Sequence, residues 1–264
     1  MQERVLIAGF GYLGRKLAHI LIENNYLVYA IKRQKIEDEQ NVHLIYSDIN
    51  NLTADDIPDI DYAFFLLAPN SFNEENYRRT YIDSLLSFCN IMKQKKVKKV
   101  IFSSSTSMYE HTDGCIVNEE TNVDPQKFPG KIMLEAESIL KENCDNPIIA
   151  RLSGIYGKER GDIYKTLENV ANPLFYSNRI HQEDACNALF YLMKKCKTPE
   201  TIIITDSNPE QYKNIASWLN IEPKINPNPK RFSNKRLSNA KLIATGFKFK
   251  YPSYKEGLSD IIRK

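Results

Sequence analysis

The sequence predicts an α/β protein built on a doubly wound parallel sheet, and three observations support this fold class. Apolar runs of strand length alternate with stretches of helical periodicity as far as about residue 205. These runs are nearly continuous, as in parallel strands that are covered on both faces. The first run enters a glycine-rich turn that leads directly into a helical pattern.

The glycine-rich turn is the strongest of these signals. A strand at residues 5–8 precedes it, and a helix near 13–24 and a second strand at 26–31 follow, which completes a β-α-β unit. In Gly-x-Gly-x-x-Gly, the first glycine allows the turn, the second lets the backbone approach phosphate, and the third lets the helix pack on the strand. The pattern predicts a dinucleotide site; the competing interpretation is an ordinary glycine turn. Its residues are Gly9, Phe10, Gly11, Tyr12, Leu13 and Gly14.

The end of the second strand indicates which dinucleotide to expect. An acidic residue about 20 positions past the glycines binds the ribose of NAD, whereas a basic residue there accommodates the 2′-phosphate of NADP. This chain has Lys32 and Arg33 and no acid at that place. NADP is therefore favoured over NAD, and the alternative is that both cations are simply solvated.

Further along the chain, strands and helices keep alternating. The predicted parts are a dinucleotide-binding domain at residues 1–152 and a small substrate lobe at 153–264, interleaved with the last sheet strands. The regular alternation ends after residue 205, where the chain is richer in proline and asparagine. The remaining strands are expected at residues 42–46, 62–69, 97–102, 148–152 and 201–205, and helices near 74–95 and 131–143.

Composition excludes several classes of function. The 264 residues carry a net charge of +3 that is spread along the chain, which argues against nucleic acid as a partner. Five cysteines show no C-x-x-C spacing, and four histidines are isolated in sequence, so no metal site is expected. No signal peptide and no run of about 18 apolar residues is visible. We therefore expect a soluble, cytoplasmic protein that has no membrane partner.

Several further segments, in this order and spacing, resemble a known family. Together with the glycine motif, they resemble the short-chain dehydrogenase/reductase superfamily in its extended and atypical branches, which include NAD-dependent epimerase/dehydratase proteins. The resemblance covers nearly the whole chain and implies a Rossmann-type sheet. It also implies a nucleotide-sugar substrate, a homodimer formed through helices equivalent to 74–95 and 131–143, and cofactor contacts from Asp48, Ile49, Leu67, Ala68 and Pro69. The segments are Asp48-Ile49, Leu67-Ala68-Pro69, residues 102–109, 151–157 and 179–184, and Gly246-Phe247 with residues 251–254 and 257–258.

The family's chemistry requires a serine or threonine, a tyrosine and a lysine four residues after the tyrosine. The resemblance places the serine at Ser105 and the lysine at Lys131, because Glu135 fixes the register. The position of the tyrosine is then occupied by Lys127, and no tyrosine occurs between Tyr109 and Tyr156. An unassisted phenol is a weak base at neutral pH, so the loss of this arrangement matters.

Other groups are candidates for the missing role and for substrate binding. Tyr109 is the favoured substitute acid and Tyr156 the second choice, although Tyr109 could instead be an aromatic that packs under a loop. Arg160 and Arg179 could pair with a phosphate or a carboxylate, or be solvated. His181 could contact substrate or act as a general acid, or lie in a structural turn.

Three interpretations follow from the sequence. The first is an NAD(P)-dependent oxidoreductase or a nucleotide-sugar epimerase/dehydratase-like enzyme, atypical because Lys127 replaces the tyrosine. The second is a non-catalytic NAD(P)-binding regulatory protein, which the loss of the phenol would favour. The third is a structural subunit of a complex. Fold and cofactor site do not select a substrate, so its identity stays open.

Overall fold

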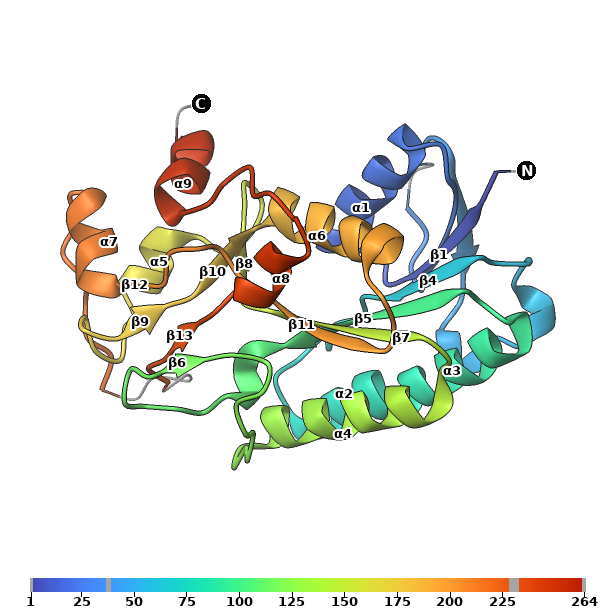
Figure 1. The fold of residues 1–264 in the computed structure, drawn as a ribbon, viewed down its shortest axis with the longest axis horizontal. Coiled ribbons are helices and arrows are strands. Elements are labelled where there is room, and N and C mark those ends of the chain that lie inside the picture. The colour runs from blue at the N-terminus through green and yellow to red at the C-terminus, as the bar shows by residue number, and fades with distance from the viewer. Residues whose placement is uncertain (1, 37–38, 228–232, 263–264) are drawn as a thin grey trace. The chain divides into compact units, whose positions relative to one another are not determined.

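The structure is a computed structural model that describes residues 2–36, 39–227 and 233–262. It contains a seven-stranded sheet in the order β11-β7-β5-β4-β1-β2-β3 (Figure 1). The strands with a defined register, from β3 to β5, pair in parallel. The predicted doubly wound α/β fold is confirmed. The strands are β1 (Arg4–Ala8), β2 (Leu27–Lys32), β3 (Val42–Tyr46), β4 (Tyr62–Phe65), β5 (Lys99–Ser105), β7 (Pro147–Leu152) and β11 (Glu200–Ile204).

The chain forms two compact units. Unit 1 comprises Met1–Ser105, Lys127–Ala150 and Cys186–Thr201. Unit 2 comprises Thr106–Gln126, Arg151–Ala185 and Ile202–Lys264. The domain boundary expected after residue 152 stays a prediction.

The first strand of unit 1 is apolar along its buried length. The side chains of β1 from Val5 to Ala8 are fully buried, which explains why this run shows no alternation. Figure 1 shows α3 and α4 side by side. The helices and helical turns are α1 (Tyr12–Glu23), η1 (Ile49–Asn51), η2 (Ala54–Asp56), α2 (Glu74–Arg78), a π-helical turn (Arg79–Asp83), α3 (Ser84–Lys95) and α4 (Phe128–Asn143), with α6 (Gln182–Lys195) largely in this unit.

Two helix predictions need correction. The helix expected over residues 74–95 is interrupted by the π-helical turn Arg79–Asp83. The helix expected to begin at 131 begins at Phe128, because a proline fits in the first turn, where its missing N–H is not needed. Lys127 is therefore the N-cap residue of α4.

Unit 2 holds the part of the chain whose pattern was too weak to assign. Its core includes Tyr156, Ile163, Leu167, Ile215 and Leu258. Its small sheets are two-stranded, and β8 and β10 pair in parallel. The elements are η4 (Thr106–Met108), β6 (Ile116–Val117), β8 (Gly154–Tyr156), α5 (Ile163–Leu167), β9 (Tyr176–Ser177), β10 (Arg179–His181), β12 (Glu210–Gln211), α7 (Tyr212–Trp218), β13 (Arg236–Leu237), α8 (Ala240–Ala244) and α9 (Tyr254–Ile262).

None of the helices in the described ranges is long and apolar enough to cross a bilayer.

Candidate active site

The glycine turn lies where the strand order reverses, between β1 and β4. In open α/β sheets, ligands bind at this switch point. Gly9 has a φ of +110°, and a Cβ on it would lie 2.7 Å from the carbonyl carbon of Leu66. A Cβ on Gly14 would lie 2.2 Å from the carbonyl oxygen of Gly9. Both positions therefore require glycine, for the turn and for close helix packing respectively.

The first turn of α1 fits a pyrophosphate. Its N-cap is Gly11, which supplies no side chain to bond the free N–H groups of the helix. A Cβ on Gly11 would meet no protein atom within 4 Å, so backbone here can approach a ligand closely. Phe10 and Leu13 are buried, and Tyr12 is half-buried. The residues present thus fit a dinucleotide, with contacts made through backbone N–H groups.

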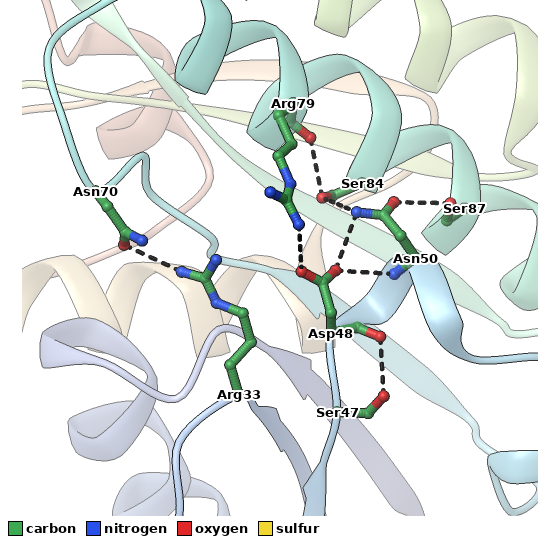
Figure 2. Close-up of polar contacts among 8 residues, drawn as sticks. All are labelled: Arg33, Ser47, Asp48, Asn50, Asn70, Arg79, Ser84 and Ser87. Atoms are coloured by element: carbon green, nitrogen blue, oxygen red, sulfur yellow. Dashed lines mark hydrogen bonds and ion pairs between the residues drawn. The ribbon is translucent and has the colours of Figure 1, made fainter.

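The two cations at the end of β2 differ in what they do. The Lys32 ammonium donates to the Phe10 carbonyl oxygen at 3.2 Å, and burial together with nearby Arg15 lowers its pKa. Arg33 is exposed and donates to Asn70 Oδ1 at 3.0 Å (Figure 2). Lys32 therefore stabilises the glycine turn, whereas the guanidinium of Arg33 is exposed to solvent.

Asp48 belongs to a second network in Figure 2. Its Oδ1 accepts from the Asn50 backbone N–H at 3.1 Å, and its Oδ2 accepts from Arg79 at 3.1 Å. Sequence reasoning missed Arg79, because it comes from the π-helical turn, 31 positions away. Ile49 is buried beside Asp48. After β4, Leu67 and Pro69 are half-buried and Ala68 is exposed.

The catalytic candidates lie in both units and are described within each. In unit 1, Ser105 ends β5 and is half-buried, and Lys131 is exposed in the first turns of α4. The neighbouring Ser104 donates to Glu137 Oε1 at 2.5 Å, in a buried contact that ties β5 to α4.

In unit 2, Tyr109 is fully buried. Its hydroxyl accepts a short hydrogen bond from the buried Arg151, whose guanidinium also lies 5.2 Å from the centroid of the tyrosine ring. Tyr109 therefore packs as an aromatic and at the same time has its oxygen beside a cation. Sequence reasoning named the tyrosine but not Arg151.

The remaining predicted substrate residues also belong to unit 2. Tyr156, Arg179 and His181 are buried together on β8 and β10, and the rings of Tyr156 and His181 meet edge-on at 5.4 Å. Arg160 is exposed in the turn after β8 and is not part of this cluster. Sequence reasoning missed Asp206, which follows β11 and is buried. Its place at the end of an apolar run was the only signal.

The sequence model of the NAD dependent epimerase/dehydratase family matches residues 5–204. The chain belongs to this family, whose members are of the extended short-chain dehydrogenase/reductase type.

Individual relatives are more distant. The chain is 25% identical over 201 residues to a UDP-glucose 4-epimerase of Dictyostelium discoideum, across 63% of this chain and 58% of that protein. It is also similar to a protein assigned to the NAD-dependent epimerases/dehydratases from Methylobacillus flagellatus, with a TM-score of 0.81, 25% identity and coverage of 100% and 98% of the two chains. MoeE5, solved with UDP-glucuronic acid and NAD, shares the fold at a TM-score of 0.83 and 20% identity, over 97% and 96% of the chains.

Proposed function

We propose that this chain is a nucleotide-sugar epimerase- or dehydratase-like enzyme that prefers NADP to NAD. The observation that carries the proposal is the glycine turn, where Gly9 and Gly14 are sterically required while the backbone at Gly11 stays open to a ligand. The exposed Arg33 and the absence of an acid at that place support the NADP preference. Nucleotide-sugar chemistry is supported by the family and by the named relatives.

When bound, the dinucleotide supplies a hydride acceptor and donor. We propose that residues 9–14 bind the pyrophosphate and that Arg33 binds the 2′-phosphate, while Lys32 stabilises the turn. We propose that Asp48 and Ile49 contact the adenine, and that Arg79 orients the Asp48 carboxylate. Leu67, Ala68 and Pro69 border the cofactor after β4.

Proton transfer requires a group that replaces the missing phenol. We assign it to Tyr109, because its hydroxyl oxygen accepts a hydrogen bond from the guanidinium of Arg151, a cation beside the phenol as in the family's tyrosine–lysine arrangement. Ser105 would orient the substrate oxygen, and Lys131 would hold the ribose. We keep Tyr156, Arg160, Arg179 and His181 as substrate residues.

A second candidate function is a cofactor-binding protein without turnover. The full burial of Tyr109 favours it, and so does the resemblance, which places Lys127 at the position of the tyrosine.

Calorimetric titration with NADPH, NADP⁺, NADH and NAD⁺ tests the shared part of both functions. We expect binding with an NADP preference, and failure of all four to bind would overturn both. UDP-glucose and UDP-glucuronic acid are then tested for turnover with the preferred cofactor. Turnover that is lost in Tyr109→Phe supports the enzyme, whereas full turnover in that variant excludes Tyr109 as the acid. Tight binding without turnover of any nucleotide sugar favours the second function.

A further inference from the structure

The proposed function leaves open what three buried polar side chains of unit 2 bind, although two of them, Tyr156 and Arg179, are among its substrate residues. Tyr156 is 1% exposed, Arg179 is 8% exposed and Asp206 is 1% exposed. Within the described part of the chain, the Tyr156 hydroxyl, Arg179 Nε and Asp206 Oδ2 have no hydrogen-bond partner. Buried polar groups are nearly always bonded, so three such atoms require an explanation.

The three side chains are neighbours. Tyr156 lies opposite His181 in the β8–β10 pair, and Arg179 shares a face of β10 with His181 because side chains alternate along a strand. The Asp206 N–H donates to the Arg179 carbonyl oxygen at 2.8 Å, which places Asp206 beside β10. Asp206 and Arg179 also act electrostatically on each other, and both act on the Tyr156 hydroxyl.

Asp206 is held in its neutral form near neutral pH. Burial is the main cause and raises its pKa to about 8. The Asn208 N–H and the Arg179 guanidinium act in the opposite direction, because they favour the carboxylate. The carboxylates of Glu256 on α9 and Asp184 on α6 add to the rise. Asp184 itself accepts from the N–H groups of Lys250 and Tyr251, at 2.9 and 2.7 Å. Asp206 Oδ2 can therefore donate a proton below about pH 8.

The site consequently offers three donors and a cation. Arg179 Nε–H, the Tyr156 hydroxyl and the protonated Asp206 all lack an acceptor, and the guanidinium charge is buried. An ordered water could accept some of these bonds, but it would leave the buried charge uncompensated. A group with two oxygens and a single negative charge satisfies both needs, because arginine binds carboxylates in this way. A phosphate dianion fits less well, since Glu256 and Asp184 lie nearby.

We propose that unit 2 holds an interior site for a carboxylate, bound by Arg179 and by hydroxyl donors from Tyr156 and Asp206. The carboxylate is either a small free acid or the acid group of a larger ligand such as a uronic sugar. The proposal deepens the proposed function, on which it rests for the role of Tyr156 and Arg179 as substrate residues. Its test needs no cofactor and no turnover, so its failure can be distinguished from failure of the proposed function.

Binding of formate and acetate to the full chain without cofactor tests the site. Calorimetry and thermal unfolding are measured against chloride at equal ionic strength, at pH 6.5 and pH 9. We expect carboxylate binding at pH 6.5 that weakens about tenfold at pH 9, where Asp206 loses its proton and repels the ligand. Asp206→Asn keeps a donor that cannot ionise, so it should bind at both pH values.

Two further variants define the contacts. Tyr156→Phe should weaken binding about tenfold through the loss of one hydrogen bond to a charged group. Tyr164→Phe, which changes an exposed tyrosine of α5, is the matched control and should leave binding unchanged. Arg179→Gln should abolish binding; if it does not fold, the Asp206→Asn pH profile still decides.

The outcomes separate the sources and the alternatives. Binding of formate or acetate indicates a site for a small acid, and binding of UDP-glucuronic acid but not UDP-glucose indicates the acid group of a sugar. Equal responses to chloride and acetate, or an unchanged pH dependence in Asp206→Asn, would overturn the proposal in favour of an interior that holds only water.

Discussion

Two arginines, one in each unit, are proposed to bind anions, and their surroundings differ. Arg33 is exposed at the end of β2, with one amide partner. Arg179 is buried on β10, and its Nε has no partner within the described chain. An exposed guanidinium is satisfied by water and binds an anion only when other contacts bring one close, whereas a buried guanidinium is destabilising until something neutralises it.

This difference decides whether a site can be recognised from the sequence or only from the structure. The site at Arg33 depends on a short sequence motif, because the turn, the helix start and the end of β2 lie within 25 positions, from Gly9 to Arg33. The cluster at Arg179 is assembled from β8, β10 and the end of β11, and its chemistry depends on burial. Burial is a property of the packed protein and cannot be read from residue type.

The largest effect is expected at the glycine turn. Gly14→Ala places a Cβ 2.2 Å from the Gly9 oxygen, a clash with backbone that cannot move away cheaply. We expect unfolding free energy to fall by about 3 kcal/mol, and dinucleotide binding to be lost. Gly11→Ala is the matched comparison, because its Cβ meets no protein atom. It should leave stability within about 0.5 kcal/mol while weakening dinucleotide binding. Chemical denaturation and calorimetry measure both, and a Gly14→Ala variant of normal stability would contradict the packing argument.

The Arg33 site is tested by its selectivity. Arg33→Ala should weaken NADP binding about 10- to 100-fold and leave NAD binding unchanged, since only NADP carries the 2′-phosphate. Lys35→Ala, an exposed cation two residues further on, controls for general charge. An equal loss of affinity for both cofactors would remove the case for 2′-phosphate recognition.

The packing around the buried cluster is tested at α9. A Cβ on Gly257 would lie 1.9 Å from the Tyr156 hydroxyl oxygen and 2.8 Å from its Cζ. Gly257→Ala should therefore cost about 1–3 kcal/mol of unfolding free energy. Tyr156→Phe should recover part of this loss, because it removes the nearest atom. The double-mutant cycle in urea measures the coupling, and additive losses would show that the two residues do not touch.

The last test concerns the pH dependence of stability, an effect that is the smallest when it is counted per pH unit. The pKa of Asp206 is about 8 in the folded chain and near its ordinary value of 3.8 when unfolded. The folded state thus binds one more proton between these limits, and stability from this group falls as pH rises, by up to about 1.4 kcal/mol per pH unit. Asp206→Asn should lack this slope, so its stability relative to the parent should increase from pH 5 to pH 8. A constant difference in unfolding free energy across this range would mean that Asp206 is ionised throughout.

The sequence by itself determined the alternation of strands and helices, the parallel sheet and the glycine turn, because these depend on periodicity and on residues close together in the chain. It also placed Arg33, Asp48, Tyr109 and Arg179 among the candidates. Only the tertiary structure decided their partners: Arg79 on Asp48, Arg151 on Tyr109, and Asp206 beside Arg179. Each partner comes from a distant segment, and the protonation of Asp206 depends on how deeply the fold buries it.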